Sequence, residues 1–246
     1  MGLGLGRSQV SAAGNGLLNN LVAYWKLDEA GGDRSDAHAS YTLTDNNTVG
    51  STTGKINNAA VFVAAQSESL SNTAAIFDPG LGSFTVNTWC YITAVSETEY
   101  LATKGNRISG VAGWSIFLST VSGICVRCGA GGVVQRASQT HALPADGWHM
   151  VTLVINRTTN IVLGYLDGSN TGWTDGGGGP TTNSLVGMGT ISKSDPLYLG
   201  RSSISTGNYL NRALDEVSVW SVALSDADIS VLYNGGAGLP YSQFTT

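Results

Sequence analysis

Residues 213–236 read Ala-Leu-Asp-Glu-Val-Ser-Val-Trp-Ser-Val-Ala-Leu-Ser-Asp-Ala-Asp-Ile-Ser-Val-Leu-Tyr-Asn-Gly-Gly, and they predict a strand, a turn and a short helix. The strand is Ala213–Trp220, because β-branched and aromatic residues favour an extended, pleated backbone. Ser225 is the helix N-cap, and Asp228 three positions later completes a capping box. Gly235–Gly236 ends the helix, since glycine adopts the left-handed C′ conformation without steric cost.

The predicted helix has one apolar face. Ile229, Leu232 and Tyr233 fall on that face, and Leu224 before the cap can contact Ile229 as a hydrophobic staple. A helix this short is marginal alone and depends on packing for its stability. We therefore expect it to lie against a larger body.

This closing segment resembles that of the laminin-G-like, concanavalin A-like jelly-roll family. Leu214–Trp220 matches the family's last strand, and Leu224-Ser225 followed by Leu232–Gly236 matches its turn and helix. Asp228 stands where the family usually has glutamate. The resemblance implies an all-β fold, a concanavalin A-like jelly-roll sandwich of two antiparallel sheets with one short C-terminal helix.

Further blocks resemble the family in the same order along the chain. Tyr24–Gly32 matches its first strand and the loop that follows, and Gly54–Phe62 matches a second motif with Asn57 in place of the usual glycine. Turn signals separate strand-like runs about every 8–12 residues, the spacing of a sandwich. Thr44–Thr53 reads as a turn-rich loop. The predicted strands are Leu21–Leu27, Tyr41–Leu43, Ser83–Thr93, Tyr100–Lys104, Trp114–Leu118, Gly123–Cys128, Val133–Ala137, Trp148–Asn156, Ile161–Leu166 and Leu197–Gly200.

Composition limits the domain organisation and the partners. The chain has 246 residues, 33 glycines and 12% charged residues, which suits one β-domain with many turns and a neutral polar surface. We place this domain at residues 21–246, after a glycine-rich N-terminal arm of residues 1–20. The net charge of −5 without a basic cluster argues against nucleic acid as a partner. No apolar run approaches the ~20 residues that span a bilayer, so we expect no membrane insertion.

We expect no catalytic activity. Jelly-roll glycosidases carry two carboxylates in a Glu-x-Asp-x-x-Glu pattern, which is absent here. Glu97 and Glu99 are two residues apart, but they flank a predicted turn and read as solvated loop residues. The histidines are scattered, and no Gly-x-Ser-x-Gly nucleophile motif occurs. Cys90, Cys125 and Cys128 lack the second ligand pair of a zinc site and are expected in or near the core.

A metal site is predicted after the first strand. Asp28, Glu29, Asp33 and Asp36 lie in one loop, and calcium prefers clustered carboxylate and carbonyl oxygens. The family resemblance implies that the first and last strands are neighbours, which makes Asp33 and Asp215 the ligands of one structural calcium ion. The alternative is an Asx turn together with a buried carboxylate that is bonded to backbone amides.

Sugar recognition needs flat aromatic faces beside amides and hydroxyls. Five of the six tryptophans fall on predicted strands and are assigned to the core: Trp25, Trp89, Trp114, Trp148 and Trp220. Trp173 instead lies in the Gly/Thr/Ser-rich stretch 169–193, so it is our ligand-binding residue. The alternative is that Trp173 anchors its own loop.

These features predict a non-enzymatic binding or adhesion module. Met1–Ser8 lacks the basic and apolar regions of a secretion signal, although the family resemblance implies an extracellular module. A bacteriophage virion protein is consistent with both observations, because virions assemble in the cytoplasm and act outside the cell. We therefore expect the chain on the virion surface, as a tail, fibre or capsid decoration. The expected partners are other virion proteins through the N-terminal arm and a cell-surface glycan, in a homo-oligomer or a larger assembly. The alternatives are a purely structural decoration protein without glycan affinity and a carbohydrate-binding accessory domain of a secreted bacterial protein.

Overall fold

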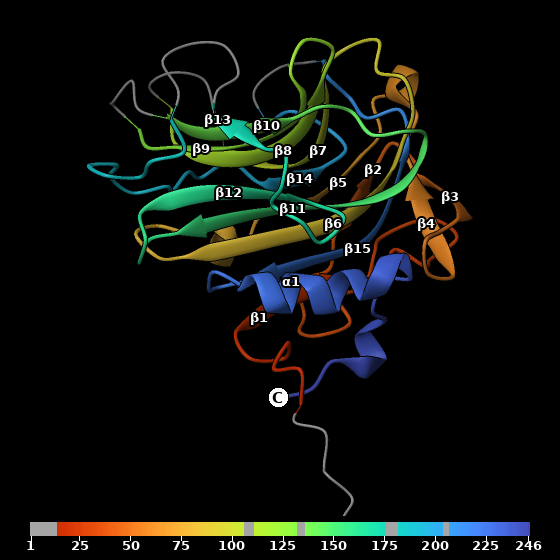
Figure 1. Cartoon of the computed structure of the whole chain (residues 1–246). Helices are drawn as coiled ribbons and strands as arrows, with labels where there is room; N and C mark the ends of the chain where they lie inside the picture. Colours follow the sequence, from red (N-terminus) through yellow and green to blue (C-terminus); the bar gives the residue numbers. More distant parts are fainter. Residues whose placement is uncertain (1–13, 106–110, 132–135, 176–181, 204–206) are drawn as a thin grey trace, which may run out of the picture.

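Two antiparallel sheets stack face to face as a sandwich (Figure 1). A computed structural model of the chain describes residues 14–105, 111–131, 136–175, 182–203 and 207–246. The jelly-roll sandwich expected from the sequence is thereby confirmed.

Sheet A has the order β12-β11-β6-β15-β4-β3, and β1 pairs with β15 off this path. The predicted adjacency of the first and last strands is confirmed by that pairing. The strands of sheet A are β1 (Leu21–Trp25), β3 (Gly50–Thr53), β4 (Asn58–Val61), β6 (Phe84–Ile92), β11 (Gly147–Asn156), β12 (Ile161–Leu166) and β15 (Ala213–Trp220).

Sheet B has the order β13-β10-β9-β8-β7-β14-β5-β2. It forms the other layer of the sandwich in Figure 1. Its strands are β2 (Thr44–Asn46), β5 (Ser69–Asn72), β7 (Glu99–Gly105), β8 (Gly113–Ser119), β9 (Gly123–Gly129), β10 (Arg136–His141), β13 (Thr174–Asp175) and β14 (Leu197–Leu199).

The assignment of Thr44–Thr53 to a turn-rich loop is wrong, because this segment contains β2 and β3. Both strands are short and rich in Thr, Asn, Ser and Gly, so their sequence carries little strand signal. β2 pairs with β5 and β3 with β4 at the sheet edges. Long-range pairing therefore makes these strands, and local propensity does not. The predicted strand Val133–Ala137 falls partly on residues 132–135, which lie outside the described residues.

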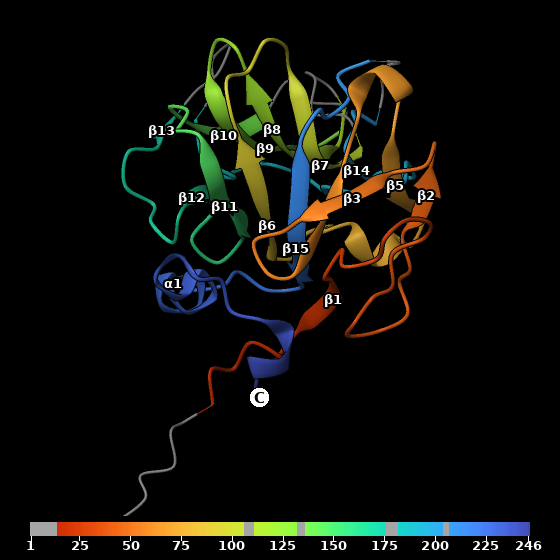
Figure 2. The ribbon, with the colours of Figure 1, turned by 90° about the vertical axis from the view of Figure 1, so that its right-hand side faces the viewer.

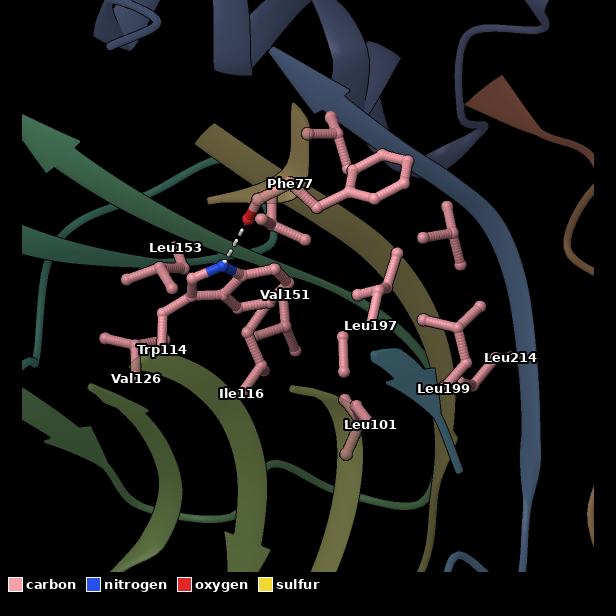
Figure 3. Close-up of a cluster of buried hydrophobic side chains, with 14 of the residues drawn as sticks. Phe77, Leu101, Trp114, Ile116, Val126, Val151, Leu153, Leu197, Leu199 and Leu214 are labelled. Atoms are coloured by element: carbon pink, nitrogen blue, oxygen red, sulfur yellow. Dashed lines mark hydrogen bonds between the residues drawn. The ribbon is translucent and has the colours of Figure 1, made fainter. Parts of the chain in front are cut away.

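The main core lies between the sheets (Figure 3). Trp114 of β8 is fully buried there, and its Nε1 donates to the Phe77 carbonyl at 3.0 Å. Cys90 and Cys128 lie in the same core, where burial raises the pKa of each thiol to about 12. Cys125 is also buried. The expected core position of the cysteines is confirmed.

The helix α1 (Asp226–Tyr233) covers part of the outer face of sheet A, on the side of β1 and the C-terminus (Figures 1 and 2). Its capping box is confirmed: the Ser225 hydroxyl accepts from the Asp228 N–H, and the Asp228 carboxylate accepts from the Ser225 N–H. The left-handed turn begins one residue earlier than predicted, at Asn234 with φ of 50°. Asparagine tolerates this conformation better than most non-glycine residues. Short 3₁₀ turns occupy Ala64–Gln66, Ala75–Phe77, Asn234–Gly236 and Tyr241–Gln243.

Residues 14–20, which the sequence places in the N-terminal arm, pack on the domain. Leu17 is 1% exposed in a second apolar cluster, which also contains Trp220 and Ile229. The Trp220 indole donates to the Leu17 carbonyl at 2.8 Å, and Asn15 bonds to Thr245 near the C-terminus. Residues 1–13 of the predicted arm lie outside the described residues. No helix in the described part of the chain is long and apolar enough to cross a bilayer.

Candidate functional site

A hollow of about 480 Å³ opens on the part of sheet A's outer face that α1 leaves uncovered. We call it the aromatic hollow. It is bordered by residues from β3, β4, β6, β11 and β15 and from the segments next to them. They are Thr52, Thr53, Val61, Tyr91, Thr93, Trp148, Asn211, Arg212 and Ala213.

The hollow arises from strand register and side-chain size. Trp148 of β11 pairs with Tyr91 of β6, so two large side chains stand side by side on one face. Ala213 of β15 pairs with Val61 of β4, which pairs with Gly50 of β3. Successive side chains of a strand alternate between the faces, so a row of paired residues lies across one face. The drop from large to small residues along this row leaves the depression.

The aromatic wall of the hollow is partly exposed. The rings of Tyr91 and Trp148 meet edge to face, with centroids 5.6 Å apart and an interplanar angle of 77°. Tyr91 is 42% exposed. The nearby Trp89 is covered instead, because Tyr233 of α1 stacks on it at 5.8 Å and the Lys55 ammonium lies over its ring.

The polar end of the hollow is held rigid by an ion pair. Arg212 donates to both carboxylate oxygens of Glu99, with Nη2 to Oε1 at 2.6 Å and Nε to Oε2 at 2.8 Å. Its Nη1 donates to the Thr93 hydroxyl at 3.1 Å, and the Asn211 N–H donates to Glu99 Oε2 at 2.9 Å. Burial lowers the pKa of Arg212, but the Glu99 hydrogen bonds raise it, and the net shift is upward. The guanidinium therefore stays charged and its charge is balanced.

Two sequence-based assignments are wrong here. Glu99 is 3% exposed inside β7, so it is not a solvated loop residue. The sequence did not indicate this, because its ion-pair partner, Arg212, is distant in sequence. Trp148 was assigned to the core, but it is only partly buried. The alternation of side chains along β11 could have placed Trp148 on the outer face of sheet A. Trp148 shares that face with Met150, two residues later, and Met150 belongs to the second cluster. Which part of that face is covered depends on α1, whose Ile229 and Leu232 belong to the second cluster.

Trp173 lies beside a different hollow, of about 580 Å³, and its neighbours Gly172 and Thr174 line it. The Trp173 ring lies flat against Gly164 of β12, where an added Cβ would be 2.5 Å from the ring. It also contacts the His141 ring, with centroids 5.4 Å apart. These contacts anchor the loop on the domain, as the alternative for Trp173 expects. Its role in ligand binding stays a prediction.

Asp33 and Asp215 occupy different surroundings. Asp33 is exposed, and its Oδ1 accepts from the Asp45 N–H at 2.9 Å. Asp215 is fully buried, and its two oxygens accept from the N–H groups of Ile56 and Glu216, each at 2.9 Å. Burial raises the pKa of Asp215 to about 7. The alternative of a carboxylate bonded to backbone amides therefore describes Asp215.

The described residues contain no group of three or more His, Cys, Asp or Glu side chains that could hold a metal ion. A calcium site at Asp33 would therefore need loop carbonyl oxygens among its ligands. Calcium binding stays a prediction.

Residues 63–230 match the family model of the concanavalin A-like lectin/glucanases superfamily. The chain belongs to this superfamily. The match covers most of the sandwich, including the aromatic strands β6 and β11 and the last strand, β15.

Solved structures share the fold of this concanavalin A-like chain. The binding domain of Paraclostridial Mosquitocidal Protein 1 superposes with a TM-score of 0.70 at 14% identity, over 89% of this chain and 53% of that one. The ligand-binding domain of botulinum neurotoxin serotype D, in complex with N-acetylneuraminic acid, gives a TM-score of 0.62 at 15% identity, over 91% and 52%. A Trypanosoma rangeli sialidase gives 0.60 at 16% identity, over 90% and 34%.

These likenesses establish the fold alone, because the identities are low. The chain spans about half the length of the toxin binding domains and a third of the sialidase. No curated protein matches the sequence.

Proposed function

We propose that this chain is a non-enzymatic carbohydrate-binding module and that the aromatic hollow takes a neutral sugar ring. The observation that carries the proposal is the partly exposed Tyr91–Trp148 pair beside a rigid polar end. The fold is shared with toxin binding domains, one of them in complex with a sugar acid. That likeness supports a glycan as the class of ligand.

The chemistry of the hollow suits a pyranose ring. Its C–H face can lie against Trp148 and Tyr91, since aromatic faces offer a large apolar contact with a negative π cloud. The ring hydroxyls can bond with Thr52, Thr53 and Asn211 at the opposite rim, which are exposed. Pockets of this kind combine apolar walls with a few fixed polar groups.

The charge balance selects a neutral ligand. Arg212 lines the hollow, but both oxygens of Glu99 already neutralise its guanidinium. A carboxylated sugar would have to displace Glu99 and leave a buried carboxylate unpaired, which costs several kcal/mol. The hollow therefore favours uncharged sugars.

We further propose that the module serves adhesion on the outside of a larger particle, as a virion surface protein. The N-terminal arm would attach it to neighbouring virion proteins. A protein inventory of purified virions that lacked this chain would remove this part of the proposal. A particle that contains the chain, with no glycan affinity in any assay, would favour the structural decoration protein.

The sugar proposal is tested with purified residues 1–246 on a glycan array, with calcium and with a chelator. For each neutral sugar that binds, Trp148→Ala and Tyr91→Ala are compared with wild type by titration calorimetry. An aromatic contact contributes about 0.5–1.5 kcal/mol beyond area burial, so we expect each variant to bind at least about twofold more weakly.

Trp173→Ala is the matched control, because Trp173 is also partly buried and borders the other hollow. We expect the affinity of the aromatic hollow for neutral sugars to keep its wild-type value in this variant. Loss of binding in Trp173→Ala alone would move the site to the hollow beside Gly172 and Thr174. No binding of any neutral sugar would overturn the proposal.

A further inference from the structure

We propose a second binding site on sheet B, where Arg201 between Tyr198 and Tyr209 takes the carboxylate of an acidic sugar. This site extends the proposed function to a second ligand class, and it does not depend on the aromatic hollow.

Arg201 is held in place by aromatic contacts. Its guanidinium carbon lies 4.7 Å from the ring centroid of Tyr198 and 5.4 Å from that of Tyr209. Nε donates to the Ser202 carbonyl at 2.9 Å. Stacking on aromatic rings and one fixed hydrogen bond leave the planar guanidinium a narrow range of orientations.

Among the described residues, no carboxylate pairs with Arg201. The ion pairs among the described residues join Lys104 to Asp78, His149 to Asp167 and Arg212 to Glu99. Only Nε of Arg201 has a hydrogen-bond acceptor among the described residues. Its two terminal nitrogens therefore present their N–H donors for a ligand.

Two buried arginines, Arg34 and Arg212, differ from Arg201. Arg34 donates to the carbonyls of Gly32, Val49 and Gly50, and Arg212 is bound by Glu99. Arg201 is partly exposed. A partly exposed arginine that is fixed in orientation but not neutralised is suited to bind an anion.

Hydroxyl groups share a row of sheet B with Tyr198, on the outer face of that sheet. Leu197 and Leu199 of β14 are buried in the main core, so Tyr198 between them points to the outer face. Tyr198 pairs with Ser71 of β5, which pairs with the exposed Thr44 of β2. These residues follow one another across the sheet and offer hydroxyls beside the aromatic rings.

The chemistry of this surface matches a carboxylated sugar. A guanidinium binds a carboxylate through two parallel N–H···O bonds. These bonds are shorter and stronger than hydrogen bonds between neutral groups. The phenol rings can contact the sugar ring, and the hydroxyls can bond with its hydroxyl groups. The ligand class is therefore a glycan that ends in a sugar acid, such as a sialic or uronic acid.

The two proposed sites lie at opposite ends of one connection. Arg201 follows β14 of sheet B, and Arg212 directly precedes β15 of sheet A. The Leu210 N–H donates to the Gly200 carbonyl at 2.8 Å, so residues next to Arg201 and near Arg212 are bonded to each other. Arg212, whose charge Glu99 balances, lies at the proposed neutral-sugar site. Arg201, which has no ion-pair partner among the described residues, lies at the proposed acidic-sugar site.

The test is titration of residues 1–246 with the methyl glycosides of N-acetylneuraminic acid and glucuronic acid. The methyl glycoside of glucose, in which an uncharged CH₂OH replaces the glucuronate carboxylate, serves as the neutral control ligand. Saturation-transfer NMR at 50 mM and 500 mM salt measures the affinity. We expect at least one acidic sugar to bind, and the neutral analogue to bind at least tenfold more weakly at this site. High salt should lower the affinity for the acidic sugar, because salt screens the attraction between charges.

Variants separate this site from the hollow and from general charge. Arg201→Gln should weaken the binding of the acidic sugar at least tenfold. Arg201→Lys should restore little of this affinity, because lysine lacks the planar guanidinium that binds a carboxylate through two hydrogen bonds. Lys26→Gln removes an exposed cation that follows β1 of the other sheet and should leave the affinity for the acidic sugar unchanged. Trp148→Ala, which weakens neutral sugars at the aromatic hollow, should not weaken the acidic sugar. Circular dichroism checks that each variant is folded.

Equal affinity in Arg201→Gln and wild type would overturn the proposal, and so would an equal loss in Lys26→Gln. Failure of both acids to bind up to millimolar concentration would also overturn it. In each of these cases, neutral-sugar binding that Trp148→Ala abolishes would still support the aromatic hollow. The two proposals therefore fail separately.

Discussion

The buried ion pair between Arg212 and Glu99 joins the two sheets at the rim of the aromatic hollow. Glu99 begins β7 in sheet B, and Arg212 directly precedes β15 in sheet A. The side chains are 5% and 3% exposed, so both charges are largely removed from water. One contact therefore stabilises the sandwich edge and sets the charge of the site.

Glu99→Gln is expected to destabilise the fold. It leaves the Arg212 charge buried without its counter-charge, and breaking one partner of a buried pair typically costs about 3–5 kcal/mol. Urea denaturation followed by fluorescence measures the free energy of unfolding. Glu97→Gln is the control, because Glu97 is exposed, and it should leave the stability unchanged. An unchanged stability in Glu99→Gln would contradict the role assigned to the pair.

Stability is expected to fall as the pH rises from about 4 to 8. Burial raises the pKa of Asp215 from 3.8 to about 7 and that of Glu216 from 4.5 to about 8. The folded state thus binds more protons than the unfolded state within this window, so the free energy of unfolding decreases with pH. The stabilisation is complete below the unfolded-state pKa values and is lost through the folded-state values.

The pH prediction is checked by urea denaturation at pH 5 and pH 8. Glu216→Gln removes one of the two groups, and it keeps a side chain that can accept from the Tyr24 hydroxyl, the partner of Glu216. Its stability should change less between the two pH values than that of wild type. The same pH dependence in both proteins would argue against a raised pKa at Glu216.

Gly164→Ala is expected to displace Trp173. The added Cβ would lie 2.5 Å from two ring atoms of Trp173, so the ring must move. Overpacking of this kind costs about 1–3 kcal/mol. Near-ultraviolet circular dichroism and urea denaturation should both change. Gly31→Ala is the control, since nothing lies within 4 Å of its added Cβ. A Gly164→Ala protein with wild-type spectra would contradict the packing of Trp173 on β12.

Calcium is predicted to raise the melting temperature relative to a chelator, with Asp33 as a ligand. Binding to the folded state alone stabilises by about 2.7 kcal/mol when calcium is a hundredfold above its dissociation constant. Asp33→Asn should reduce this shift, because it removes the carboxylate charge but keeps a side-chain oxygen that can accept from the Asp45 N–H. Identical melting temperatures with calcium and with chelator would exclude the structural calcium ion.

The sequence by itself determined those features that depend on near neighbours in the chain. The Ser225–Asp228 capping box and the strand Ala213–Trp220 were predicted as they occur, because capping bonds span three residues and strand preference is local. The sandwich followed from such segments and from their resemblance to a known family.

The tertiary structure alone decided which polar and aromatic residues are exposed. Trp89 and Tyr91 share one face of β6, but Tyr233 and Lys55 cover Trp89 and leave Tyr91 open. Arg212 is neutralised and Arg201 is not, because Glu99 reaches only the former from a strand that is distant in sequence. Burial and charge pairing at these sites depend on which segments meet in space, and no local pattern of residues encodes that.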